Sequence, residues 1–215
     1  MPPARELPLA DLVARAQALA DLGPRQLLGI AGAPGAGKST LAERIVAEVG
    51  PLARLVPMDG FHLAQSELVR LGREGRKGAP DTFDVNGFVS LLRRLRRLEP
   101  TSVWAPAFRR DLEEPVAGAI EVPPEVRLVV TEGNYLLLRD DPWEEVRTLV
   151  HEIWFLDLDA ALRVRRLTAR HEAYGKTPEQ ARAWALGSDE ANAARVAGTA
   201  GYADLVVRLA DPLPG

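Results

Sequence analysis

The sequence of 215 residues contains no cysteine. This absence excludes a disulfide scaffold, a thiolate metal site and a cysteine nucleophile. No stretch reaches the roughly 18 apolar residues of a membrane-spanning helix, and the first residues lack the apolar run of a secretory signal peptide. We therefore expect a cytoplasmic protein with no membrane partner.

Lysine is also scarce, because Lys and Arg together number 27 but only Lys38, Lys77 and Lys176 are lysines. A lysine at a motif position is therefore less readily explained by chance than an arginine would be. The formal net charge of −3 provides no broad basic surface, so we expect no nucleic-acid partner. The length fits one domain over residues 1–215 that carries a modest insertion and a lid.

Short apolar runs alternate with segments of helical periodicity. Buried strands are predicted at 27–31, 54–57, 126–131, 151–156 and 205–209. Helices are predicted at 9–22, 38–49, 63–71, 88–98, 160–171 and 178–186. This alternation predicts an α/β fold with a parallel sheet that is covered on both faces. Residues 101–122 interrupt the alternation, and we expect a small hairpin insertion there, with Asn86 capping the helix before it.

One segment matches the phosphate-binding pattern G-x-x-x-x-G-K-[ST] between a predicted strand and a predicted helix. It consists of Gly32, Ala33, Pro34, Gly35, Ala36, Gly37, Lys38 and Ser39. Glycines let backbone N–H groups approach phosphates, and the helix N-terminus adds partial positive charge. We expect Lys38 to reach the β- and γ-phosphates and Ser39 to bind Mg²⁺. The alternative is an ordinary glycine-rich turn, which the strand–helix context disfavours.

Three acidic residues follow or end predicted strands, where the sites of open α/β sheets lie. Asp59 is placed to accept the proton of a substrate hydroxyl, although Asp59-Gly60 is also a common turn pair. Glu132 is placed to assist Mg²⁺, or else to cap its strand. Asp157 is better explained as a turn residue or as the N-cap of the helix at 160–171.

Arginines crowd the helix at 160–171, where Arg163, Arg166 and Arg170 share one face. We expect a lid at about 163–178 that closes over the phosphates, with Arg166 offsetting the charge that develops in the transition state. A solvated basic helix is the alternative. His62 lies beside Asp59 in the sequence and is expected to touch the substrate.

Several segments between about residues 25 and 208 are similar to those of a known family. They are 32–40, 57–62, 78–84, 113–115, 118–120, 131–135, 170–171, 175–177 and 189–193. Together they resemble the P-loop kinase group that contains uridine kinase, bacterial pantothenate kinase and phosphoribulokinase. The resemblance is nearest to its bacterial nucleoside/nucleotide kinase-like branch, also described as fructose-transport-system-kinase-like.

The resemblance implies the three-layer P-loop NTPase fold with a five-stranded parallel sheet, a helical lid and the cofactors ATP and Mg²⁺. It implies that Asp59 is the catalytic base, that Glu132 is the Mg²⁺-side acid and that Arg166 belongs to the lid. Nucleotide contacts are expected from Gly32 to Ser39 and from Thr40, Arg170 and Asn192. Acceptor contacts are expected from His62, Phe83, Asp84, Arg109 and Tyr135.

The sequence departs from this group in the insertion. Related sequences tend to carry Phe-Asp-Arg after its proline, but here Pro106-Ala107-Phe108 is followed by Arg109-Arg110. The acceptor therefore stays open among a nucleoside, a sugar and a pantothenate-like acid. Two other functions compete: a nucleotide-dependent switch without an acceptor, which has no need of Asp59, and a nucleic-acid-end kinase, which the acidic net charge disfavours. A homodimer also stays open.

Overall fold

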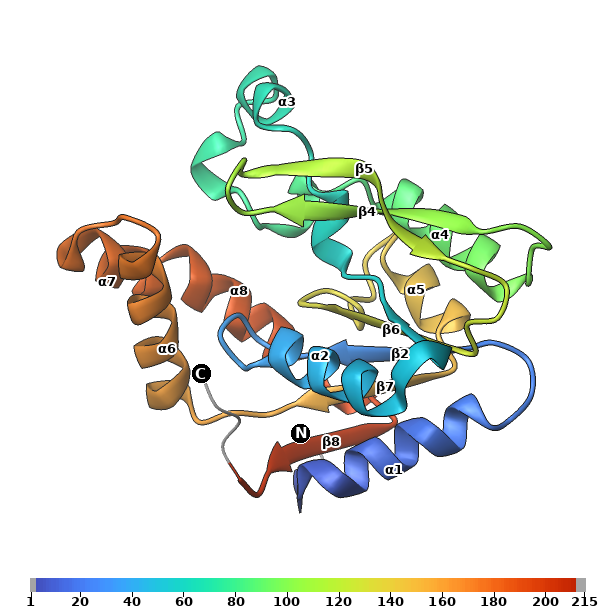
Figure 1. Cartoon of the computed structure of the whole chain (residues 1–215). Coiled ribbons are helices and arrows are strands. Elements are labelled where there is room, and N and C mark those ends of the chain that lie inside the picture. The colour runs from blue at the N-terminus through green and yellow to red at the C-terminus, as the bar shows by residue number, and fades with distance from the viewer. Residues whose placement is uncertain (1–2, 212–215) are drawn as a thin grey trace.

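The computed structural model describes residues 3–211 and contains a six-stranded, wholly parallel sheet with helices on both faces (Figure 1). The strand order is β1-β8-β7-β2-β6-β3. The strands are β1 (Arg5–Leu7), β2 (Gln26–Ala31), β3 (Ala53–Leu55), β6 (Leu128–Gly133), β7 (Glu152–Leu156) and β8 (Leu205–Leu209). The predicted α/β fold with a parallel sheet is confirmed.

The sheet has one strand more than the five predicted. The additional strand is β1, which lies at the edge and pairs in parallel with β8, Arg5 opposite Val207 and Leu7 opposite Leu209. Its three residues include two charged ones, so it carries no apolar run for sequence analysis to detect. Its position depends on hydrogen bonding to β8, which is a non-local interaction.

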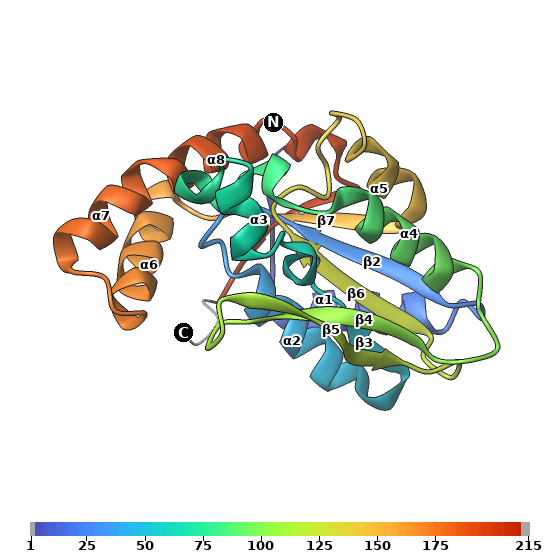
Figure 2. The same cartoon turned by 90° about the horizontal axis from the view of Figure 1, so that it is seen from above.

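Helices cover the two faces of the sheet, as the view from above shows (Figure 2). One face carries α1 (Leu9–Ala20) and α2 (Lys38–Val49), and the other carries α4 (Val85–Arg96), α5 (Glu144–Leu149) and α8 (Ser188–Ala197). Along β6, Leu128 and Val130 pack on the first face and Val129 packs on the second. Burial on both faces explains why the strands read as continuous apolar runs. Between residues 3 and 211, none of the helices is both long and apolar enough to span a membrane.

Two features project from this framework on either side of one end of the sheet (Figures 1 and 2). The first is an antiparallel hairpin of β4 (Val103–Arg109) and β5 (Glu114–Val122), which corresponds to the predicted insertion. The second is the helix pair α6 (Ala160–Ala173) and α7 (Pro178–Leu186). The lid predicted at about 163–178 covers most of α6 and ends where α7 begins. A shorter helix, α3 (Gln65–Arg70), extends beyond the hairpin.

Two helix caps differ from the sequence-based expectation. Helix α4 begins at Val85, and the carboxylate of Asp84 rather than the side chain of Asn86 accepts the capping hydrogen bond, from Gly87 N at 2.9 Å. Helix α6 is capped by Asp159, whereas Asp157 forms an ion pair with Arg208 at 2.5 Å. In both cases the cap is offset by two residues, which periodicity alone does not resolve.

The hairpin packs directly on the turn that carries Asp59. A Cβ atom on Gly60 would lie only 2.4 Å from the carbonyl oxygen of Pro106 in β4. Real Cβ atoms do not approach a backbone oxygen so closely, so glycine is required for the two segments to touch. The glycine thereby fixes the distance between Asp59 and the hairpin.

We predict that Gly60→Ala lowers the free energy of unfolding by about 1–3 kcal/mol, the usual cost of overpacking a close contact. Urea unfolding would measure it. Gly75→Ala is the matched control, because nothing lies within 4 Å of its Cβ position, and we expect a change within about 0.5 kcal/mol. Equal unfolding free energies for both variants would show that the hairpin does not rest on Gly60.

Candidate functional site

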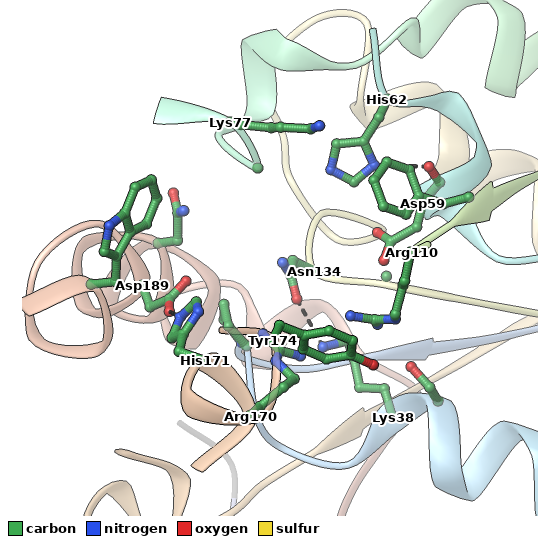
Figure 3. A pocket seen from close by; sticks show the side chains of 18 of the residues that line it. Lys38, Asp59, His62, Lys77, Arg110, Asn134, Arg170, His171, Tyr174 and Asp189 are labelled. Carbon is green, nitrogen blue, oxygen red and sulfur yellow. Dashed lines mark hydrogen bonds and ion pairs between the residues drawn. The ribbon is translucent and has the colours of Figure 1, made fainter. Parts of the chain in front are cut away.

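A cavity of about 490 Å³ lies at the carboxyl ends of β2 and β6, between the hairpin and helices α6 to α8 (Figure 3). This is the position where parallel α/β sheets bind their ligands. Its floor is the turn between β2 and α2, one wall is the hairpin with the Asp59 turn, and the opposite wall is α6, α7 and α8.

The turn between β2 and α2 has the backbone of an anion-binding loop. Gly35 and Gly37 have φ angles of +80° and +97°, which favour glycine. Gly37 is the N-cap of α2 and provides no side chain to cap it. The N–H groups of the first turn are therefore available to an anion, in the partial positive charge of the helix N-terminus.

Lys38 extends from the start of α2 into the cavity floor. Its side chain is buried, with a residue exposure of 7%, and its Nζ donates hydrogen bonds to the carbonyl of Ala33 at 3.1 Å and to Asn134 Oδ1 at 2.8 Å (Figure 3). Burial lowers the pKa of Lys38, while the carboxylates of Glu132 and Asp59 act in the opposite direction. The ammonium is thus held between neutral acceptors and negative charges.

Glu132 lies beside the turn because β6 pairs with β2, with Glu132 opposite Ile30. Its Oε1 accepts a hydrogen bond from the Ser39 hydroxyl at 2.9 Å. Burial, and then the charge of Asp59, raise the pKa of Glu132 to about 7. The carboxylates of Glu132 and Asp59 and the hydroxyl of Ser39 are hard oxygen ligands, which Mg²⁺ prefers. A divalent cation would also relieve the repulsion between the two carboxylates, so these residues fit Mg²⁺.

This set is a partial coordination sphere. Within residues 3–211, no group of three or more His, Cys, Asp or Glu side chains is arranged to hold a metal. Mg²⁺ usually keeps several waters and binds through one or two carboxylates together with substrate phosphates, so a small set of protein ligands suits it.

The turn that carries Asp59 makes a close contact with the end of β6, in addition to the contact of Gly60 with the hairpin. A Cβ atom on Gly133, at the end of β6, would lie 2.6 Å from the sulfur of Met58. The glycine lets the turn at 58–61 approach the strand end, and this places the carboxylate of Asp59 near Glu132 and Lys38. Asp59 also lines the cavity (Figure 3).

The hairpin side of the cavity is aromatic. The ring of His62 lies 4.1 Å from that of Phe83 and 4.9 Å from that of Phe108, between ring centroids. His62 Nδ1 donates to the carbonyl of Asp59 at 2.8 Å, which leaves Nε2 as an acceptor. Burial lowers the pKa of His62, so the ring is neutral near neutral pH. Lys77 lies over the Phe108 ring, 5.3 Å from its centroid.

The helical side of the cavity is polar. His171 Nε2 and Asp189 Oδ2 are 2.8 Å apart and join α6 to α8. Lys176 lies over the ring of Trp184, 4.7 Å from its centroid. Arg170 also lines this side.

Many residues predicted for the site line this cavity. They are Pro34, Gly35, Lys38, Ser39, Asp59, His62, Phe83, Glu132, Arg170 and Asn192. The others of the phosphate-binding segment, Gly32, Ala33, Ala36, Gly37 and Thr40, belong to the same turn and the start of α2 without lining the cavity. Arg166 lies against the turn, with a guanidinium nitrogen 3.3 Å from the Cβ position of Gly37.

The structure places three of the predicted acceptor residues outside the cavity lining. Asp84 caps α4. Arg109 is exposed and forms an ion pair with Asp111 at 2.7 Å. Tyr135 is buried, and its hydroxyl donates to the carbonyl of Gly78 at 2.5 Å, so it holds the loop before Phe83.

Several lining residues were not predicted as site residues. They are Lys77, Gly78, Phe108, Arg110, Glu113, Gly133, Asn134, His171, Tyr174, Lys176, Trp184 and Asp189. Two of them, Lys77 and Lys176, could have been singled out by the scarcity of lysine, since the chain has only three. All three line the cavity. Asn134 comes directly after β6, two residues beyond Glu132, at the strand end where the sites of open α/β sheets lie.

The raised pKa of Glu132 makes a prediction about stability. The folded protein binds this proton more tightly than the unfolded chain, where the pKa has its ordinary value of 4.5. The contribution of the proton to the free energy of unfolding is therefore fully present below pH 4.5 and is lost as the pH rises through about 7. Glu132→Gln mimics the protonated form. We expect it to be more stable than the wild type by up to about 3 kcal/mol at about pH 8, and equal to it at about pH 4, below the ordinary pKa of 4.5.

Denaturant unfolding at both pH values, without divalent cations, would measure this difference. A stability difference that is the same at both pH values would contradict the raised pKa.

No family model matches the chain. It is 34% identical over 177 residues to "Putative uridine kinase C227.14" of Schizosaccharomyces pombe, covering 77% of this chain and 74% of that protein. It is 33% identical over 192 residues to the uncharacterized protein YggC of Escherichia coli, covering 87% and 79% of the two chains.

Solved structures that are described as kinases are also similar to this chain. The structure described as a "putative fructose transport system kinase" from Silicibacter sp. TM1040 is 36% identical, with a TM-score of 0.84 over 93% of this chain and 98% of that one. YFH7 from Saccharomyces cerevisiae, described as a "putative P-loop containing kinase", has a TM-score of 0.83 at 18% identity, which shows the shared fold alone. On these similarities and on its phosphate-binding turn, the chain belongs to the P-loop kinases with uridine kinase-like relatives.

Proposed function

We propose that the protein is an ATP-dependent kinase that transfers the γ-phosphoryl group to a hydroxyl of a small metabolite. One observation carries the proposal: the phosphate-binding turn with Lys38 and the carboxylate of Asp59 line the same cavity. Relatives named as ATP-dependent kinases support the choice of nucleotide.

The turn and its surroundings form the nucleotide half. The N–H groups at the start of α2 and the Nζ of Lys38 bind phosphate oxygens, and Arg170 faces them from α6. Arg166, which touches the turn at Gly37, adds positive charge there. Ser39 and Glu132 would hold Mg²⁺, which supplies electrostatic stabilisation of the phosphate oxygens when bound.

The hairpin wall forms the acceptor half. Asp59 accepts the hydroxyl proton as the acceptor oxygen bonds to the γ-phosphorus and the bond from phosphorus to the bridging oxygen breaks. The aromatic rings of His62, Phe83 and Phe108 provide a wall that orients the acceptor. Acceptors with an apolar or ring portion suit this wall, and a nucleoside, a sugar and a pantothenate-like acid are the classes to test.

We predict that Asp59→Asn lowers acceptor-dependent turnover by about 10²–10⁴-fold, because the amide cannot take the proton. Nucleotide affinity should change by less than about threefold, since the turn is intact. A coupled assay for ADP over a panel of nucleosides, sugars and vitamin precursors would first identify the acceptor. Turnover of the variant equal to that of the wild type would remove Asp59 from the mechanism.

We predict that Lys38→Ala lowers kcat/KM for ATP by about 10²–10³-fold, because the charge that stabilises the transferring phosphoryl is lost. Arg94→Ala serves as the control, since Arg94 is exposed and paired with Glu99 outside the cavity. Steady-state kinetics at saturating acceptor would measure both variants. Unchanged kinetics of Lys38→Ala would contradict the assignment of the turn to phosphate binding.

A further inference from the structure

Arg110 comes directly after β4 and lines the cavity, which its neighbour Arg109 does not. Figure 3 shows its side chain extending from the hairpin into the cavity, towards Tyr174 and Lys38. The guanidinium carbon lies 5.7 Å from the centroid of the Tyr174 ring. A cation from the hairpin thus meets an aromatic ring at the end of α6.

The charge of Arg110 is not matched by a carboxylate at salt-bridge distance among the residues that the structure describes. Arg109, the preceding residue, differs in this respect because it pairs with Asp111. The face of an aromatic ring attracts a cation without neutralising it. Arg110 therefore keeps a full positive charge that points into the cavity.

A second guanidinium faces it. Arg170 enters from α6, and its pKa is lowered by burial and then by the like charge of Arg110. Although much of the Arg170 side chain is exposed, its guanidinium lies within the cavity (Figure 3). Two cations held close together by separate elements repel each other, and an anion bound between them would relieve that repulsion.

The geometry assigns Arg110 as a catalytic residue of the proposed kinase, in contact with the transferring γ-phosphoryl group on the side opposite Arg170. This inference rests on the proposed function. With Lys38 below, the group would be enclosed by cations from the turn, from α6 and from the hairpin. Transfer spreads charge over its equatorial oxygens, and pre-positioned cations stabilise that charge.

The side-chain type also matters. A guanidinium is planar, can donate two parallel hydrogen bonds to phosphate oxygens and stacks on a ring, whereas an ammonium is a compact point charge. Arg110→Lys would keep the charge and lose the fork and the stacking on Tyr174. The lysine variant should therefore recover only part of the activity.

The experiment compares Arg110→Ala, Arg110→Lys and Arg109→Ala with the wild type. Isothermal titration calorimetry would measure the affinity for ADP and for the non-hydrolysable ATP analogue with an imido β–γ bridge, both with Mg²⁺. For Arg110→Ala we expect unchanged ADP affinity and an analogue affinity about tenfold weaker, since only the analogue carries the γ-phosphate. Acceptor-dependent turnover, and ATP hydrolysis without acceptor, should fall by about 10²–10³-fold.

Arg110→Lys should lie between alanine and wild type in both measurements. Wild-type binding and turnover in Arg110→Ala, or an equal loss of affinity for both nucleotides, would overturn the assignment of Arg110 to the γ-phosphoryl. So would a loss in Arg109→Ala that matches or exceeds that of Arg110→Ala. If the wild type bound neither nucleotide, the proposed function itself would fail, and this result differs from all of the others.

Discussion

The buried ammonium of Lys38 is the constraint on which the site depends. A charge that is 7% exposed needs acceptors and counter-charges nearby, and the turn that carries it supplies one carbonyl, that of Ala33. A second acceptor is the side chain of Asn134, just after β6. The counter-charges are the carboxylates of Glu132 in β6 and Asp59 after β3. Burial, and then the repulsion between these two carboxylates, raise the pKa of Glu132. The cavity is thus a set of charges whose balance is completed by cations and phosphates from its ligands.

Glycines set the distances within this set of charges. Gly133 lets the turn at 58–61 meet the end of β6, and Gly60 lets the hairpin rest on that same turn. At Gly35 a Cβ atom would lie 2.7 Å from Leu167, so the phosphate-binding turn packs against α6 in the same way. Three close contacts therefore join the turn, the proposed base, the hairpin and α6 into one unit, and a methyl group at any of them would separate two parts of the site.

Most of the sheet and its phosphate-binding turn could be predicted, because strands buried on both faces read as apolar runs and the turn is a local motif. Strand β1 could not, since it depends on pairing with a distant strand. The choice between Arg109 and Arg110 depends on the pleat of β4, which a register shift between Ala105 and Ala107 interrupts. Asp84 and Tyr135 were assigned to the acceptor, but a helix cap and the carbonyl of Gly78 engage them instead. Such contacts depend on the folded chain and leave no local signal.

The distribution of the lysines has a practical consequence. All three line one cavity, while the remaining cationic side chains of this arginine-rich chain are guanidinium groups or imidazoles. Every side-chain amine of the molecule is therefore gathered at a single place. A reagent that acylates primary amines would modify lysines only there, and a bound occupant would protect them. Chemical labelling would thus report occupancy of this cavity before any acceptor is known.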